Sequence, residues 1–167
     1  VVAELSNNAN GSLDRAFRLL DAAKESGASA AKLQCYSVEE LVSLRGDGPA
    51  PAQWSHLTMR DLYTRAMTPR EWFAPLYRYA EDIGLPLFSS VFWAESIAFL
   101  EAIGNPVYKI AMLDNANADL IAAARATGKP VLVSAERHQM TEGLDVLWLF
   151  CPAGYPTIGY GHVVTDA

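Results

Sequence analysis

A lysine and a glutamine interrupt an otherwise apolar stretch near the start of this chain. The stretch reads Ala-Ala-Lys-Leu-Gln-Cys-Tyr and covers residues 30–36. If it forms a strand, Lys32 and Gln34 leave one face while the apolar residues between them leave the other, because side chains alternate along a strand. A primary amine in that position is suited to binding an anion, and an amide is suited to orienting a polar substrate.

Further polar side chains occupy comparable places in other apolar runs of the sequence. They are Glu4, Ser90, Lys109, Ser134 and His162. In a parallel barrel the carboxyl ends of the strands meet at one mouth. Two lysines, hydroxyl groups and a carboxylate there would bind a dianion such as a phosphate ester that also carries a carboxylate. The alternative is that each lysine is an edge or snorkelling residue, which is harder to maintain for two lysines in comparable places.

The elements that would position these residues follow one rhythm from end to end, with apolar β-type runs alternating with helical segments. Seven strands are predicted, at residues 1–5, 30–36, 85–92, 106–112, 130–135, 146–152 and, more weakly, 157–164. Four helices are predicted between them, at residues 12–27, 68–84, 94–104 and 117–128. Each of these helical segments closes on a glycine, the residue typical of a helix end.

Two helix starts are specific enough to predict by residue. Ser12 is expected to cap the first helix. Thr68 is expected to cap the second, with Pro69 in the first helical position and Glu71 completing a capping box. The segment 37–67 is a long excursion after the second strand, and its Gly-Asp-Gly-Pro-Ala-Pro tract indicates a surface loop.

The repetition of strand and helix places the chain in the α/β class with parallel strands and right-handed crossovers. Two architectures satisfy this pattern, a doubly wound sheet and an eight-stranded TIM (β/α)8-type barrel. No glycine-rich fingerprint follows the first strand, which argues against a dinucleotide-binding sheet. The long excursion after a strand favours the barrel, because barrels build their sites from such loops.

Composition limits the kinds of partner. The chain has 167 residues, 51% of them hydrophobic, and a net charge of −6, so we expect about one globular domain without a membrane partner. The acidic balance argues against a nucleic-acid surface, because no basic stripe is present to neutralise phosphates. Cys35 and Cys151 lie far apart in apolar runs, which favours reduced thiols and a cytoplasmic location.

Several ordered motifs give the chain a resemblance to a known family. The opening Ala-Glu-Leu-Ser-Asn-Asn-Ala-Asn-Gly, the Ala-Lys-Leu-Gln of the second strand, and the later Tyr-Lys-Ile-Ala-Met, Thr-Gly-Lys-Pro-Val-Leu-Val-Ser and Cys-Pro-Ala-Gly-Tyr-Pro-Thr follow in order. This pattern resembles the sialic acid synthase family. The stretch Leu-Tyr-Thr-Arg-Ala-Met-Thr-Pro-Arg-Glu-Trp is most similar to the pseudaminic acid synthase branch.

The resemblance implies a phosphoenolpyruvate-dependent condensation on a TIM barrel. In such enzymes carbon 3 of phosphoenolpyruvate attacks the aldehyde of an open-chain N-acetylated amino sugar, water adds at carbon 2, and phosphate leaves with cleavage of a C–O bond. A divalent metal, manganese or magnesium, polarises the aldehyde. Carried over by position, His162 would be a metal ligand, and Glu4 would handle a proton or water beside the reacting carbon.

The same resemblance assigns the remaining polar residues. Lys32 and Lys109 would hold the carboxylate and phosphate of phosphoenolpyruvate, helped by Ser90 and Ser134. Gln34 would help to orient the substrates. Members of the family are generally homodimers, with a small C-terminal antifreeze-like domain that contributes to the site of the other subunit.

The chain also departs from the family pattern, which leaves a second function open. Met112 stands where the family has a serine, and a methionine cannot donate a hydrogen bond to a phosphate. Gly154 replaces a polar residue, and Gly161 replaces the aspartate before His162. The alternatives are therefore a synthase, a non-catalytic relative that serves as a binding or assembly subunit in surface-glycan production and, less favoured, an unrelated TIM-barrel phosphate binder.

The predicted barrel is incomplete as written. We expect a single catalytic domain over residues 1–167 with about seven strands, lacking the eighth strand, some crossover helices and the antifreeze-like domain. Only the nine residues 137–145 separate the stretch Val-Leu-Val-Ser-Ala-Glu from the sixth apolar run, whereas a parallel crossover needs about a dozen. Natural erosion, a fragment, and a sequence with omitted loops each account for this.

Overall fold

The computed structural model describes residues 1–111, 114, 117–134 and 147–149. These residues form one six-stranded parallel sheet in which each strand pairs with the next along the chain. The strands are β1 Val2–Glu4, β2 Ala30–Cys35, β3 Leu87–Val91, β4 Tyr108–Ile110, β5 Val131–Ser134 and β6 Leu147–Leu149. A doubly wound sheet reverses its strand order at a switch point. No reversal occurs among these strands, so the chain forms part of a TIM-type barrel, as predicted.

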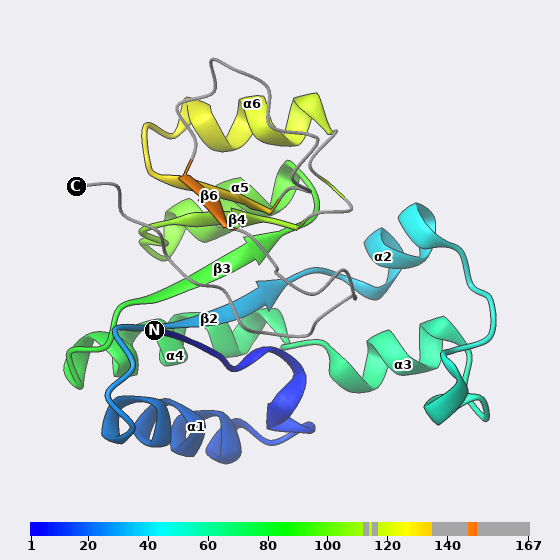
Figure 1. The fold of residues 1–167 in the computed structure, drawn as a ribbon, viewed down its shortest axis with the longest axis horizontal. Coiled ribbons are helices and arrows are strands. Elements are labelled where there is room, and N and C mark those ends of the chain that lie inside the picture. Colours follow the sequence, from blue (N-terminus) through cyan, green and yellow to red (C-terminus); the bar gives the residue numbers. More distant parts are fainter. Residues whose placement is uncertain (112–113, 115–116, 135–146, 150–167) are drawn as a thin grey trace.

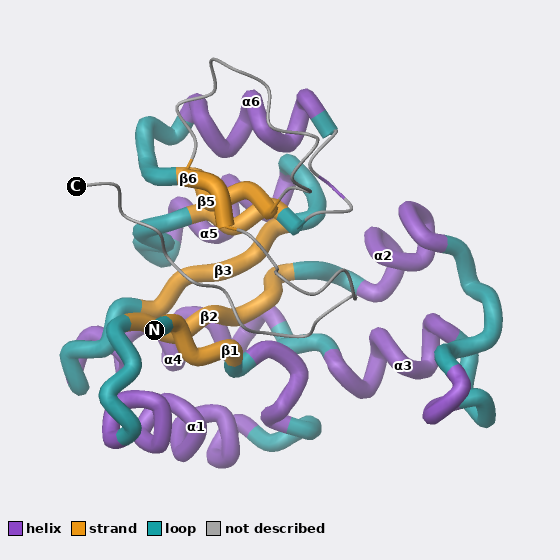
Figure 2. Tube along the Cα trace, viewed as in Figure 1, coloured by secondary structure: helices purple, strands orange, loops and turns teal. Residues whose placement is uncertain are grey.

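In the described part of the chain, six α-helices and two short 3-10 helices accompany the sheet. The α-helices are α1 Leu13–Glu25, α2 Val38–Arg45, α3 Met59–Ala66, α4 Arg70–Asp82, α5 Glu95–Ala102 and α6 Ala118–Ala126, and the 3-10 helices are η1 Ser6–Ala9 and η2 Ala52–Trp54. In Figure 1, α1 and α4 lie below the first strands, α6 lies above the last ones, and α2 lies beyond the carboxyl end of β2. The colouring of Figure 2 shows the same arrangement, with helices around the outside of the strands.

The two faces of the sheet have different neighbours. Along β2, buried and half-buried residues alternate, and the buried Ala31 and Leu33 belong to the main core between sheet and helices. On the opposite, inner face, Phe88 and Leu132 form a small apolar cluster with residues of neighbouring strands. The cluster closes the inner face below the candidate site. Five polar residues of the site each come two residues after a member of this cluster, which places them nearer the carboxyl ends of the strands. They are Glu4, Lys32, Ser90, Lys109 and Ser134.

Of the two helix starts predicted by residue, the start of α1 agrees with the structure and the start of α4 differs from it. Ser12 caps α1 by accepting a hydrogen bond from the backbone N–H of Arg15 at 3.2 Å, as predicted. The predicted cap at Thr68 is wrong, because α4 begins at Arg70 with Pro69 as the preceding residue, and Thr68 is buried. Pro69 has an extended ψ of 138°, so it turns the chain into the helix without being part of it.

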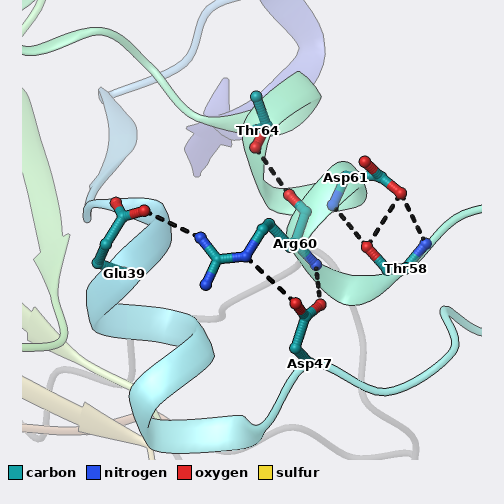
Figure 3. A network of polar contacts seen from close by, with 6 residues as sticks. All are labelled: Glu39, Asp47, Thr58, Arg60, Asp61 and Thr64. Atoms are coloured by element: carbon teal, nitrogen blue, oxygen red, sulfur yellow. Dashed lines mark hydrogen bonds and ion pairs between the residues drawn. The ribbon is translucent and has the colours of Figure 1, made fainter.

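The excursion 37–67 is more ordered than the sequence indicated. Besides the predicted loop, it contains α2 and α3, each started by a capping box, Ser37 with Glu40 and Thr58 with Asp61. Arg60 links the two helices by ion pairs to Glu39 at 2.9 Å and to Asp47 at 3.2 Å (Figure 3).

The short connection between the fifth and sixth strands does not prevent parallel pairing. β5 and β6 pair in parallel, with Leu132 opposite Leu147. The strands are shorter than the apolar runs, so residues 135–146 are available to connect them, which reaches the length that a parallel crossover needs. The predicted strand at 157–164 lies outside the described residues.

Candidate functional site

Strand register places the predicted site residues side by side on the inner face. Glu4 lies opposite Lys32 across β1 and β2, and Gln34 lies opposite Ser90 across β2 and β3. Ser90 in turn lies opposite Lys109 across β3 and β4. Since all the strands run parallel, these residues share the carboxyl end of the sheet, where barrels place their sites.

Lys32 contacts two side chains directly, and a third side chain holds its ion-pair partner. Its Nζ forms an ion pair with Glu4 and donates a hydrogen bond to the Ser90 hydroxyl at 3.1 Å. The Ser6 hydroxyl donates a second hydrogen bond to the Glu4 carboxylate. The side chains of Lys32 and Glu4 are only 14% and 15% exposed. The structure therefore brings the predicted residues Glu4, Lys32 and Ser90 together, and it adds Ser6, two residues after Glu4, which the sequence analysis missed.

Lys109 lies beside this cluster and has its own hydroxyl partner. Its Nζ donates hydrogen bonds to the Ser134 hydroxyl and to the carbonyl oxygen of Ile110, both at 2.7 Å. Burial, together with the positive charge of Lys32, lowers the pKa of Lys109 to about 7, although the Glu4 carboxylate partly opposes this. Two lysines repel each other when nothing lies between them, and an anion bound there would relieve that repulsion.

Two predicted site residues, Gln34 and His162, take no part in the hydrogen bonds around Lys32 and Lys109 that the described residues form. Gln34 lies on the same face as Lys32 but makes no side-chain hydrogen bond to the described residues, so its amide is available to a ligand. His162, the predicted metal ligand, lies outside the described residues, as do Met112, Gly154 and Gly161. Within the described ranges, no three His, Cys, Asp or Glu side chains gather as a metal site. The metal therefore stays a prediction.

The structure adds two charged residues that the sequence did not single out. Asp114, in the turn after β4, is 7% exposed and forms an ion pair with Arg45, the last residue of α2. Burial raises the pKa of the Asp114 carboxyl, against the lowering effect of Arg45 and Lys109. A polar residue just after a strand that carries a site lysine was the available signal for Asp114.

Cys35 does not belong to the chemistry of the inner face. It lies on the outer side of β2, fully buried in the main core as a free thiol. Burial raises the pKa of this thiol to about 11, so it is protonated and weakly nucleophilic near neutral pH. Cys151 lies outside the described residues.

This arrangement is suited to a doubly charged, oxygen-rich anion. Two half-buried ammonium groups and two hydroxyls lie in adjacent strands, with one carboxylate at the edge of the set. Charge-assisted hydrogen bonds from such groups are stronger than neutral ones, and low exposure increases their strength. A phosphate ester with a second acidic group matches this set of donors.

Comparison with protein families gives the arrangement a context. The model of the NeuB family matches residues 19–156 of this chain. This range includes five of the seven predicted site residues, namely Lys32, Gln34, Ser90, Lys109 and Ser134.

Curated relatives agree with the family match. The chain is 35% identical to the pseudaminic acid synthase of Helicobacter pylori over 94% of its length, and 31% identical to that of Campylobacter jejuni. It is 26% identical to the human N-acetylneuraminate-9-phosphate synthase. These matches cover 51%, 50% and 47% of the relatives, so the chain spans about half the length of the curated relatives it matches.

Solved structures support the barrel. The N-acetylneuraminic acid synthetase of Leptospira borgpetersenii superimposes with a TM-score of 0.68 at 26% identity, over 81% of this chain and 44% of that one. A truncated 3-deoxy-D-arabino-heptulosonate 7-phosphate synthase of Thermotoga maritima gives a TM-score of 0.55 at 11% identity, covering 80% of this chain and 38% of that one, which shows a shared fold alone. In the part of the chain that the structure describes, no helix has the length and apolar character to cross a membrane.

Proposed function

This chain belongs to the NeuB family, and from that membership we propose that its protein condenses phosphoenolpyruvate with the aldehyde of an N-acetylated amino sugar to form a nonulosonic acid. The product class would be of the pseudaminic or sialic type, because the matched relatives are pseudaminic and sialic acid synthases. In this reaction carbon 3 of phosphoenolpyruvate bonds to the aldehyde carbon, water adds at carbon 2, and the C–O bond to phosphate breaks.

The observation that supports this proposal is the pair of lysines on the inner face. Lys32 and Lys109 come from β2 and β4, on either side of β3, and each donates a hydrogen bond to a serine hydroxyl, Ser90 and Ser134. Phosphoenolpyruvate carries a phosphate and a carboxylate on neighbouring atoms, so two cationic positions at one strand end fit it. In this proposal both lysines bind the substrate, and the serines orient their ammonium groups.

Glu4 and Gln34 would act on the reacting atoms. Glu4 is already held by Ser6 and Lys32, so its carboxylate is oriented before substrate arrives. A carboxylate beside the bound phosphoenolpyruvate could accept a proton from the water that adds at carbon 2. The amide of Gln34, one step further along β2, would orient the polar groups of the two substrates.

A divalent metal, manganese or magnesium, remains part of the proposal. When bound, it would polarise the sugar aldehyde toward attack. The described residues do not hold a set of three ligands for it, and His162 lies outside them. The roles proposed for Lys32, Lys109, Glu4 and Gln34 need only side chains of the described sheet. The homodimer and the cytoplasmic location stay predictions as well.

Phosphate release tests the proposed function. The intact protein, incubated with phosphoenolpyruvate, manganese and a panel of N-acetylated amino sugars, should release phosphate only when a suitable sugar is present. Lys109→Met should abolish the release, whereas Lys129→Met should leave it unchanged, because Lys129 pairs with Glu101 outside this site. A folded protein that releases no phosphate with any sugar would favour the non-catalytic alternative, which rests on Met112, Gly154 and Gly161.

A further inference from the structure

The ion pair between Arg45 and Asp114 lies outside the set of residues to which the proposed function gives a role. The Nη2 of Arg45 lies 3.1 Å from Oδ2 of Asp114 and 3.4 Å from Oδ1. The Asp114 side chain is 8% exposed and that of Arg45 is 24% exposed, so both charges are largely withdrawn from water. Removing one partner of such a pair is costly, because the other is left as an uncompensated buried charge.

Arg45 also fixes the excursion to the carboxyl end of the sheet. Its guanidinium carbon lies 5.7 Å from the centre of the Phe92 ring, directly after β3. Phe92 packs with Tyr36 and Leu41 in a small separate core. Arg45 therefore joins the end of α2 to the residues that follow β3 and β4, across 69 positions of sequence in the case of Asp114.

Asp114 has a second cation within electrostatic reach. Its charge raises the pKa of Lys109, and the charge of Lys109 lowers the pKa of Asp114, so the two groups interact. In the structure both carboxylate oxygens face Arg45, while the Lys109 ammonium donates to Ser134. One carboxylate thus interacts with two cations, and its hydrogen bonds go to the arginine.

We propose that Arg45 is a positioning residue of the anion site, which holds the Asp114 carboxylate away from Lys109 so that the lysine ammonium stays available to a bound dianion. This inference deepens the proposed function and rests on it for the identity of the substrate. Without Arg45, Lys109 is the remaining cation among the described residues that interacts with the Asp114 carboxylate. A Lys109–Asp114 pair would occupy the ammonium and place a negative charge beside the incoming anion.

The charges around Lys109 determine how this would be observed. The charged groups that shift the pKa of Lys109 are Lys32, Glu4 and Asp114. Arg45 forms an ion pair with Asp114. In the native protein Lys109 titrates near neutrality, so dianion affinity should fall as pH rises above about 7. In Arg45→Met, the freed carboxylate should raise the pKa of Lys109, which weakens binding overall and moves the fall to higher pH.

Sulfate is a suitable probe, because it stays a dianion between pH 6 and 9 and binds without reacting. Titration calorimetry of sulfate into the intact protein between pH 6 and 9 should show about tenfold weaker binding in Arg45→Met, with the midpoint of the pH profile raised by about one unit. Arg45→Lys should restore most of the affinity. Arg60→Met is the matched control in the same excursion and should behave as native.

The double variant Arg45→Met, Asp114→Asn separates positioning from folding. It removes the competing carboxylate, so sulfate affinity should return toward the native value even though the ion pair is gone. Native-like binding in Arg45→Met would overturn the inference. Weaker binding with an unchanged midpoint and no recovery in the double variant would also overturn it, as would a native protein that binds no sulfate. If sulfate behaves as expected but no sugar gives phosphate release, the proposed function alone fails.

Discussion

At the scale of single residues, the charge of Lys109 decides both binding and stability. Burial and the neighbouring Lys32 lower the pKa of its ammonium to about 7. Near neutral pH a substantial fraction of the protein therefore lacks this charge, and an incoming dianion would restore it by favouring the protonated form. The buried ammonium thus favours ligand binding and lowers the stability of the protein without ligand.

Lys109→Met should make the protein more stable. The pKa of Lys109 is lowered from its ordinary value of about 10.4 in the folded state, so the folded state disfavours the protonated form and the native free energy of unfolding rises with pH between about 7 and 10.4. The variant lacks this penalty, so we expect it to exceed the native protein by about 1–3 kcal/mol below pH 7. Urea unfolding at pH 6 and pH 9 checks this. An advantage that is absent at pH 6, or that does not shrink by pH 9, would contradict it.

Glu4→Gln should separate binding from turnover. The amide keeps the size of the carboxylate and one acceptor oxygen but removes a negative charge beside Lys32, so phosphoenolpyruvate should bind about 3–10-fold more tightly. Turnover should fall about 100-fold or more, because the amide cannot accept a proton. Calorimetric titration and a phosphate-release assay measure the two effects. Weaker binding in the variant would show that Glu4 contacts the substrate in another way.

The residue types of the site could be predicted from sequence, but some partners could not. Lys32 and Lys109 stood out because a lysine in an apolar run is chemically unusual. Arg45 and Asp114 did not stand out, because an arginine near a helix end and an aspartate after a strand are ordinary in sequence. Their meeting depends on how the excursion folds back over the sheet, which local pattern does not specify.

At the scale of elements, apolar runs located all six described strands, although each strand is shorter than its run. Helices α1, α4, α5 and α6 were also predicted, and the start of α4 was misplaced by the preference of proline for the first helical turn. The helices α2 and α3 were missed because the Gly-Asp-Gly-Pro-Ala-Pro tract between them indicated that the excursion 37–67 is a loop. Their capping boxes were the signal that could have identified them.

Asn105 connects several elements, and its loss should destabilise the protein. Fully buried, it accepts hydrogen bonds from the Tyr77 hydroxyl at 2.7 Å and the Ser89 backbone N–H at 3.1 Å, and it donates to the Val107 carbonyl at 2.8 Å. Asn105→Ala leaves these groups without partners, so the free energy of unfolding should fall by about 2–4 kcal/mol. Denaturant unfolding measures the change. A loss below about 1 kcal/mol would mean that water replaces the amide.

At the scale of the whole molecule, the described residues form one side of a barrel. The inner face of this side carries the candidate site residues. The order of strands could be predicted from the alternation of elements together with the resemblance to a barrel family. The predicted strand at 157–164 and the predicted metal ligand His162 lie outside the described residues, and the chain spans about half the length of the curated relatives it matches. The prediction of a single domain over residues 1–167 stays a prediction.

The central claim is that Lys32 and Lys109 form one site for phosphoenolpyruvate. Its most direct test is calorimetric titration of phosphoenolpyruvate into the intact protein and into Lys109→Met, with Lys129→Met as the control that removes a lysine elsewhere. We expect binding to the native protein and to the control, and at least tenfold weaker binding to Lys109→Met, since the loss of a charge-assisted hydrogen bond costs about 1.5–3 kcal/mol. Equal affinity in all three proteins, or no binding to a folded native protein, would contradict the claim.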